Sequence, residues 1–135
     1  THATPYEYLM KIPALLLGRI LFSIPFLAIG LMHFTGAEQM SGSVPSWLPG
    51  GVFWIYLTGV TELGAVASIL TGKYTKTVAQ LLALQLLIYV CAIHIPGLLS
   101  ASSEALKQMF MMNILKDLGL AGGALLISHI YADRP

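Results

Sequence analysis

The run at 52–71, VFWIYLTGVTELGAVASILT, constrains this chain most, because it is long enough to cross a membrane and almost wholly apolar. A helix rises about 1.5 Å per residue, so this run spans roughly 30 Å, the thickness of the hydrocarbon core of a bilayer. One carboxylate, Glu62, stands near its middle. An ionisable group at that depth is costly and is retained mainly where it faces the interior of a helix bundle or has a function. We therefore predict a transmembrane helix whose Glu62 side chain points inward.

Composition extends this prediction to the rest of the chain. Of its 135 residues, 56% are hydrophobic and 10% are charged, whereas a soluble domain carries about 25% charged residues. Further apolar runs of helical length lie at 12–32, 78–95 and 109–131. The first is longer than the roughly 7 to 15 residues of a signal-peptide core and no cleavage site follows it, so we expect it to be retained. The sequence predicts an all-α membrane protein, with residues 1–135 forming a single domain, a four-transmembrane-helix bundle.

The basic residues predict the orientation of this bundle. Lys11, Lys73, Lys76 and Arg134 fall on the side that holds both termini, and Lys107 falls on the other side. Because cytoplasmic loops carry an excess of Lys and Arg, both termini are predicted to be cytoplasmic.

Charge and cysteine content disfavour several classes of function. The net charge is +1 and no basic run could neutralise a series of phosphates, so nucleic acid is not an expected partner. The lone Cys91 excludes an internal disulfide, a CxxC redox pair and a thiolate metal cluster within the chain. Nothing in the spacing of the histidines demands a haem, and we expect no haem, metal or flavin. Any electron chemistry must then use another bound cofactor or another subunit.

Charged residues inside the predicted spans need partners. Arg19, Glu62, Lys116 and Asp117 sum to zero, and an unpaired charge in a membrane is expensive. Because Arg cannot shed its proton and needs an acceptor, the preferred ion pair is Arg19 with Glu62. This pair is either an inert device that fixes the helix register or a functional one. Lys116 either snorkels to the surface, with Asp117 as its counter-ion, or belongs to a polar site.

A polar site is predicted toward the outer end of the bundle. His33 and His94 close the first and third predicted spans at a similar depth, and Asp117 lies in the outer half of the fourth. Together with Glu62 they are the candidate residues for proton transfer, since imidazole and carboxylate groups exchange protons readily. The alternative for both histidines is a hydrated side chain at the membrane boundary. The candidate lining of a quinone pocket is Phe26, Trp54, Tyr89 and Asn113.

An ordered set of motifs covers nearly the whole chain: GRILFSIPFLAIGLMHF, VPSWLP, TGVTELGAVASILTGKYTKTVAQLLALQLL, HIPGL and MNILKDLGLAGGALL. Over about residues 12–130 this set resembles the DoxX family of small four-helix bacterial membrane proteins. The resemblance implies a four-helix bundle in the bacterial cytoplasmic (inner) membrane and a redox setting, since relatives include the DoxD subunit of thiosulfate:quinone oxidoreductase. The positions that match the family pattern are Arg19, His33, Pro45, Glu62 and Asn113.

Two functions remain open at this point. In the first, the chain is a DoxX-like integral membrane subunit of a quinone-linked redox or respiratory complex, and its bundle binds quinone or quinol. It would then be at most an oxidoreductase subunit with no redox centre of its own. In the second, it is a non-catalytic accessory or assembly subunit that packs against partner membrane proteins. In both cases the expected partners are membrane lipids and other membrane protein subunits.

Overall fold

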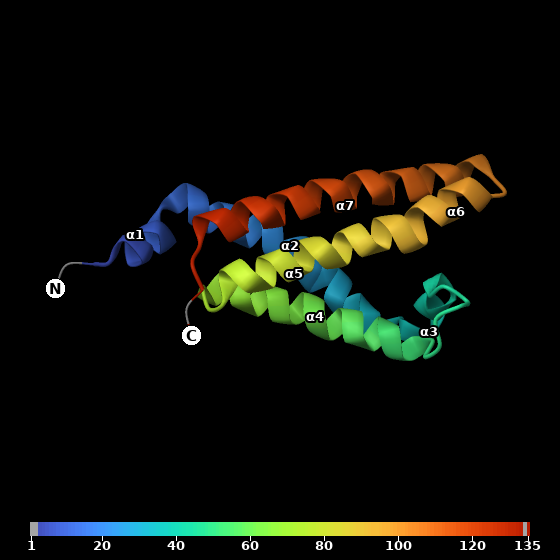
Figure 1. Cartoon of the computed structure of the whole chain (residues 1–135), viewed down its shortest axis with the longest axis horizontal. Helices are drawn as coiled ribbons and strands as arrows, with labels where there is room; N and C mark the ends of the chain where they lie inside the picture. The colour runs from blue at the N-terminus through green and yellow to red at the C-terminus, as the bar shows by residue number, and fades with distance from the viewer. Residues whose placement is uncertain (1–2, 134) are drawn as a thin grey trace.

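The computed structural model describes residues 3–133 and 135, and every regular element of this part of the chain is helical. Four long helices run side by side (Figure 1). They are α2 (Pro13–Thr35), α4 (Val52–Thr71), a third formed by α5 (Thr75–Tyr89), η2 (Val90–His94) and α6 (Ile95–Ser100), and α7 (Glu104–Ile130). Each is long and apolar enough to cross a membrane. The prediction of an all-α protein with four helices of membrane-spanning length is confirmed.

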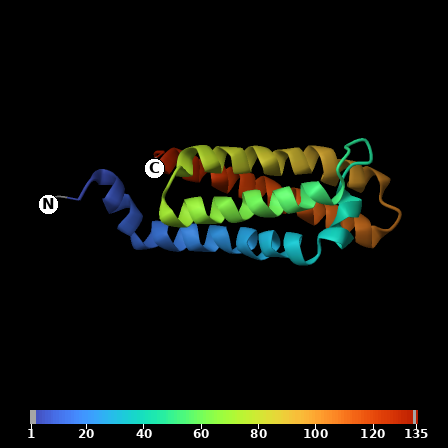
Figure 2. The same cartoon turned by 90° about the horizontal axis from the view of Figure 1, so that it is seen from below.

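Each long helix packs along its neighbour in the chain. Thus α2 lies against α4, α4 against α5, and α5 against α7. Figures 1 and 2 show both chain ends at one end of the bundle, which we call the terminal end. The connection with α3 (Ala37–Met40) and η1 (Ser41–Ser43), and the turn from α6 to α7, lie at the opposite end, which we call the loop end. Which end is cytoplasmic stays a prediction. Arg134, one of the basic residues on which that prediction rests, lies outside the described residues.

The second predicted span agrees with α4 at both ends, whereas the first continues three residues further, to Thr35. The third begins at Thr75 and continues past Pro96 to Ser100, because a proline is tolerated in the first turn of the helical segment α6. The fourth begins at Glu104, five residues before the predicted start at 109, and ends at Ile130. There the Ser103 side chain accepts a hydrogen bond from the Leu106 N–H and caps the helix.

The core of the bundle contains small side chains that allow close packing. Its buried members are Phe26, Ala65, Val66, Ile69, Leu82, Ala83, Leu86, Ala121 and Ala124. Alanines at helix contacts let the backbones approach closely, which is how helices associate where lipid is as apolar as the side chains. Large apolar side chains such as Leu81 and Leu126 point outward and are exposed, as is typical of helices that face lipid or other membrane helices.

The short helix α1 (Pro5–Lys11) precedes the first span at the terminal end (Figure 1). Thr4 accepts a hydrogen bond from the Glu7 N–H, and the Glu7 carboxylate accepts one from the Thr4 N–H, so the two residues form a capping box. This helix brings Met10 to the side chain of Arg19 in α2.

Candidate functional site

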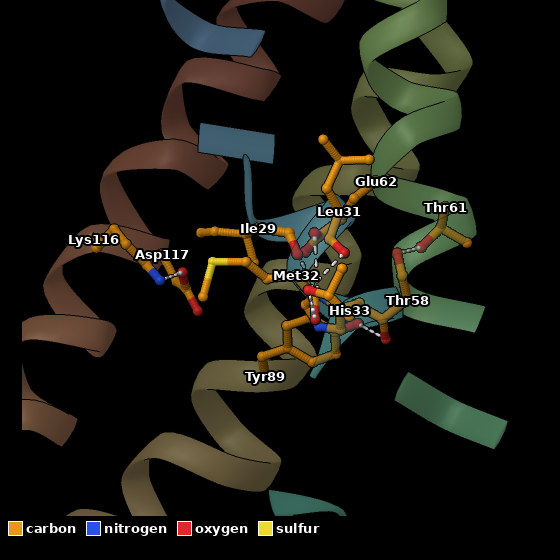
Figure 3. A network of polar contacts seen from close by, with 11 residues as sticks. Ile29, Leu31, Met32, His33, Thr58, Thr61, Glu62, Tyr89, Lys116 and Asp117 are labelled. Atoms are coloured by element: carbon orange, nitrogen blue, oxygen red, sulfur yellow. Dashed lines mark hydrogen bonds and ion pairs between the residues drawn. The ribbon is translucent and has the colours of Figure 1, made fainter. Parts of the chain in front are cut away.

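A network of polar side chains occupies the interior between the four long helices. Its members, here called the polar cluster, are His33, Thr58, Glu62, Tyr89, His94, Lys116 and Asp117. Figure 3 shows His33, Thr58, Glu62 and Tyr89 of this cluster gathered between α2, α4 and α5, and Lys116 beside Asp117 on α7, apart from them. The proton-transfer candidates His33, Glu62, His94 and Asp117 all belong to it, as two separate pairs.

The first pair joins Glu62 on α4 with His33 on α2. His33 Nδ1 lies 3.7 Å from Glu62 Oε2, which is an ion-pair distance but too long for a hydrogen bond. The same Nδ1 lies 2.7 Å from the carbonyl oxygen of Ile29. Because a carbonyl oxygen only accepts, Nδ1 carries the ring proton. Both side chains are buried, so the carboxylate is held beside an imidazole and away from water.

Two glycines let these side chains meet. A Cβ added to Gly30 on α2 would lie 3.4 Å from Glu62 Cβ, and one added to Gly59 on α4 would lie 3.0 Å from His33 Cβ. Each glycine therefore makes room for the polar residue of the other helix. Neither glycine was predicted to belong to the site, although Gly30 stands three residues before His33, and Gly59 three before Glu62, on the same helical face.

The second pair joins His94 with Asp117 on α7. His94 Nε2 lies 3.0 Å from Asp117 Oδ2, at hydrogen-bond distance, and Lys116 Nζ lies 3.5 Å from Asp117 Oδ1. Asp117 is buried, whereas the Lys116 side chain is 43% exposed, so Lys116 reaches outward and still neutralises the carboxylate. The other ring nitrogen, His94 Nδ1, is buried and finds no hydrogen-bond partner among the described residues.

An unusual helical turn sets the position of His94. The five residues Val90–His94 form a π-helical segment, η2, in which the Ile95 N–H donates to the carbonyl oxygen of Val90, five residues back. Pro96 follows at once and has no N–H to continue the regular hydrogen-bond pattern. Single π-helical turns inside α-helices are frequent at functional sites, because they alter which side chains face inward.

A hydrogen bond between α4 and α5 adds a further polar contact to the cluster. The hydroxyl oxygens of Thr58 and Tyr89 lie 2.6 Å apart. Thr58 was not a candidate, although it lies one turn before Glu62 on the same face. Further buried polar atoms have no hydrogen-bond partner among the described residues: Ser23 Oγ, Glu62 Oε2 and Gln85 Nε2. Buried polar groups are normally satisfied, so these unmet atoms need a physical explanation.

Arg19 does not join this cluster, and the predicted ion pair with Glu62 is not formed. Its Nη1 donates to the carbonyl oxygens of Ile69 (3.3 Å) and Leu70 (3.4 Å), and its Nη2 donates to that of Met10 (3.0 Å). Ile69 and Leu70 belong to the last turn of α4, whose carbonyls lack partners within the helix and form the negative end of its dipole. The prediction considered only side-chain acceptors, whereas the end of a neighbouring helix supplies backbone ones.

Aromatic side chains complete the surroundings of Arg19. The guanidinium carbon lies 5.5 Å from the ring centre of Tyr131, within reach of a cation–π interaction. The Tyr131 ring also meets that of Tyr6 edge to face, and the Tyr6 hydroxyl donates to the carbonyl of Gly72. Burial raises the pKa of the Tyr131 hydroxyl, so this hydroxyl is a protonated donor at neutral pH.

The residues predicted to line a quinone pocket lie in different surroundings. Phe26 is buried in the apolar core, and Tyr89 belongs to the polar cluster. The indole Nε1–H of Trp54 donates to the carbonyl of Pro49, 2.7 Å away in the connection before α4. Asn113 is half-buried on α7, one turn before Asp117. The structure thus brings Tyr89 to the polar cluster, keeps Asn113 on the helix of Asp117, and gives Phe26 and Trp54 packing contacts elsewhere.

Comparison with known proteins gives a family and no described function. Neither a curated protein nor a solved structure matches the chain, so the resemblance to the DoxX family stays a prediction. One family model, described as a domain of unknown function (DUF8561), matches residues 22–127, which include the whole polar cluster. Because this match covers most of the chain, the protein belongs to the DUF8561 family.

Proposed function

We propose that this protein is an integral membrane subunit of a quinone-linked redox or respiratory complex, and that its buried histidine–carboxylate pairs exchange protons with a quinone. The observation that carries the proposal is the pair His94–Asp117, in which one ring nitrogen is held at 3.0 Å by a carboxylate and the other is buried without a partner. The resemblance to DoxX proteins supports the quinone-linked setting and the bacterial inner membrane, and the distribution of the basic residues supports cytoplasmic termini.

The roles of the residues follow from this geometry. A carboxylate at Nε2 fixes the orientation of the His94 ring and stabilises the imidazolium that forms when Nδ1 takes up a proton. Lys116, at 3.5 Å, offsets part of the charge of Asp117, which keeps the pair close to neutral in an apolar environment. His33 and Glu62 form a second place where a proton can be held.

A quinone would supply the redox chemistry, because it takes up two electrons and two protons and is soluble in lipid. Its carbonyl oxygens need polar contacts on an otherwise apolar wall. Gln85 Nε2, which has no partner among the described residues, can donate to a quinone carbonyl oxygen, and His94 Nδ1 can accept the hydroxyl proton of the reduced quinol. Electrons would come from a partner protein of the complex.

The test is to purify the full chain in mild detergent, extract it with organic solvent and measure quinone by absorbance and mass. We expect quinone to co-purify, and added quinone to raise the melting temperature. His94→Gln should remove this shift, because the ring nitrogen that meets the quinone is lost. His129→Gln is the matched control, since His129 is an exposed residue near the terminal end of α7.

Two results would contradict the proposal. One is the absence of quinone in the extract together with no quinone-dependent change in melting temperature. The other is an equal quinone-dependent rise in melting temperature in the wild type, His94→Gln and His129→Gln. Quinone binding that does not depend on His94 would not place the quinone at the polar cluster.

A second candidate function is a non-catalytic accessory or assembly subunit. The observation that favours it is the outer face of α7, where a Cβ added to Gly119 or Gly122 would meet nothing within 4 Å. Small residues on an exposed membrane helix permit close approach of a partner helix. Stoichiometric co-purification of another membrane protein, lost in Gly119→Leu and kept in His94→Gln, would support this function over the first.

A further inference from the structure

A groove lies between α2 and α7 at the terminal end of the bundle, away from the polar cluster. Its volume is about 250 Å³. It exists because α2 packs along α4 and α7 packs along α5, which leaves the α2 and α7 faces only partly in contact. The α2 side is formed by Ala14, Gly18 and Phe22, and the α7 side by Gly123, Ile127 and the following Tyr131. The groove is therefore mostly apolar.

Two buried hydrogen-bond donors stand at this groove. Arg19 and Tyr131 both line it, and they are 3% and 2% exposed. Arg19 Nε and the Tyr131 hydroxyl have no hydrogen-bond partner among the described residues. An apolar groove that carries two unmet donors is suited to a ligand with an oxygen acceptor at one end.

Charge narrows the class of that ligand. No described carboxylate lies within ion-pair distance of Arg19, whose contacts are the neutral carbonyls of α4 and Met10 and the ring of Tyr131. The positive charge of the buried guanidinium is thus not neutralised by a carboxylate of the described residues. An anionic oxygen group would compensate this charge and form strong, charge-assisted hydrogen bonds.

We propose that this groove binds a long-chain fatty acid, with its carboxylate at Arg19 and Tyr131 and its hydrocarbon chain between α2 and α7. Arg19 lies six residues after Pro13, the first residue of α2, and hence about 9 Å along the helix. A carboxylate on a single chain reaches this depth without a glycerol backbone or a second chain. This site does not depend on the proposed function of the polar cluster.

Access to the two donors requires movement of one side chain. Both donor atoms are closed off from water. The Tyr131 ring lies just after the end of α7 and is held by ring contacts, with no hydrogen bond from its hydroxyl to a described residue. On this proposal, a turn of the ring away from the guanidinium would open Arg19 Nε to the carboxylate and bring the Tyr131 hydroxyl to the same group.

The first experiment measures binding of radiolabelled palmitate to the purified full chain after removal of lipid by detergent exchange. We expect one palmitate per chain, and methyl palmitate should bind at least about tenfold more weakly because it has lost the charge that meets Arg19. Equal binding of the acid and its methyl ester would overturn the proposal. Tighter binding of phosphatidic acid than of palmitate would also overturn it, in favour of a phospholipid.

The second experiment locates the bound chain with matched glycine variants. A Cβ at Gly18 or at Gly64 would meet nothing within 4 Å, so both positions accept a larger side chain. Gly18→Leu fills the groove and should reduce palmitate binding at least about tenfold, whereas Gly64→Leu, outside the groove lining, should leave it unchanged. Tyr131→Phe should weaken binding several-fold with little change in melting temperature. Unchanged binding in folded Gly18→Leu, or an equal loss in both leucine variants, would refute the site.

Discussion

The bundle carries buried charge in two regions that satisfy it in different ways. In the polar cluster, each carboxylate meets a histidine from another helix, at 3.7 Å for Glu62 with His33 and at 3.0 Å for Asp117 with His94. At the terminal end, Arg19 meets the backbone carbonyls of Met10, Ile69 and Leu70. The first arrangement can gain or lose a proton, whereas the second keeps a fixed charge.

This difference gives Arg19 a role in stability and the histidine–carboxylate pairs a capacity for proton exchange. Arg19 joins α2 to α1 and α4 through three backbone carbonyls, so removing it leaves one buried and two partly buried acceptors without this donor. The histidine–carboxylate pairs link two helices each, and either member can become neutral. We therefore expect stability to depend most on Arg19 and proton exchange to depend on the polar cluster.

The largest expected effect tests this contrast directly. Arg19→Gln should lower the free energy of unfolding by about 3 kcal/mol, because buried carbonyls lose charged donors. Unfolding of the protein in mixed detergent micelles, followed by circular dichroism, measures the change. Arg19→Lys should recover part of the loss, since it keeps the charge without the planar group. If Arg19→Gln lowers the free energy of unfolding no more than His94→Gln does, stability does not depend most on Arg19.

The next effect concerns the contact between α2 and α4. A Cβ on Gly59 would lie 2.7 Å from Phe34 Cε2 and 3.1 Å from the Gly30 carbonyl oxygen. Gly59→Ala should therefore separate the two helices and cost about 1–3 kcal/mol of unfolding free energy. Gly64→Ala, on the same helix with open space around its added Cβ, is the control. Equal melting temperatures for the two variants would show that α2 and α4 are not in close contact at this point.

A smaller effect distinguishes the two histidine–carboxylate pairs from each other. A double-mutant cycle of His94→Gln with Asp117→Asn should give a coupling free energy of about 1–2 kcal/mol. The cycle of His33→Gln with Glu62→Gln should give less, because His33 Nδ1 is shared with the Ile29 carbonyl and lies further from the carboxylate. Unfolding in detergent again supplies the numbers. A larger coupling for His33 with Glu62 would reverse this ranking.

The smallest effect concerns Asp133, which follows α7 and lies outside the membrane-spanning segments. Asp133 accepts hydrogen bonds from the Thr77 side chain and from the Thr77 N–H (2.9 Å), which lower the pKa of this carboxyl. A lowered pKa contributes stability above the ordinary aspartate value of about 3.9, and this contribution is lost as pH falls through the lowered pKa.

The lowered pKa of Asp133 therefore predicts that the difference in stability between the wild type and Asp133→Asn depends on pH. The wild type should be slightly more stable at neutral pH, and the difference should shrink toward about pH 3. Melting temperatures across this range measure it, and Glu38→Gln, an exposed acid in α3, serves as control. A difference that grows on acidification would contradict the assignment.

Much of the fold could be predicted from the sequence because the lipid environment leaves few choices for apolar runs of this length. The run that contains Glu62 begins and ends where α4 does. The start of α7 could not be predicted from apolar runs alone, because residues 104–108 are largely polar. A serine cap and an i, i+3 pair of Glu104 with Lys107 stabilise the helix there.

The candidate site could be predicted in its members but not in its pairing. The depth of His33, Glu62, His94 and Asp117 placed them in one interior, since each lies on a predicted span. Which of them meet depends on close approach at Gly30 and Gly59 and on the π-helical turn before His94. Hydrophobic periodicity does not reveal either, and backbone carbonyls as acceptors for Arg19 are invisible to any count of side-chain charges.

The wide turn at Val90–His94 also has a consequence for changes in chain length. It holds one residue more than an α-helical turn needs, so a one-residue deletion there would restore regular winding while the helix beyond it kept its orientation. Only the residues of the wide turn itself would change the side of the helix that they face. The turn therefore lets this helix lose one residue beside His94 without a change in how α6 packs on α7.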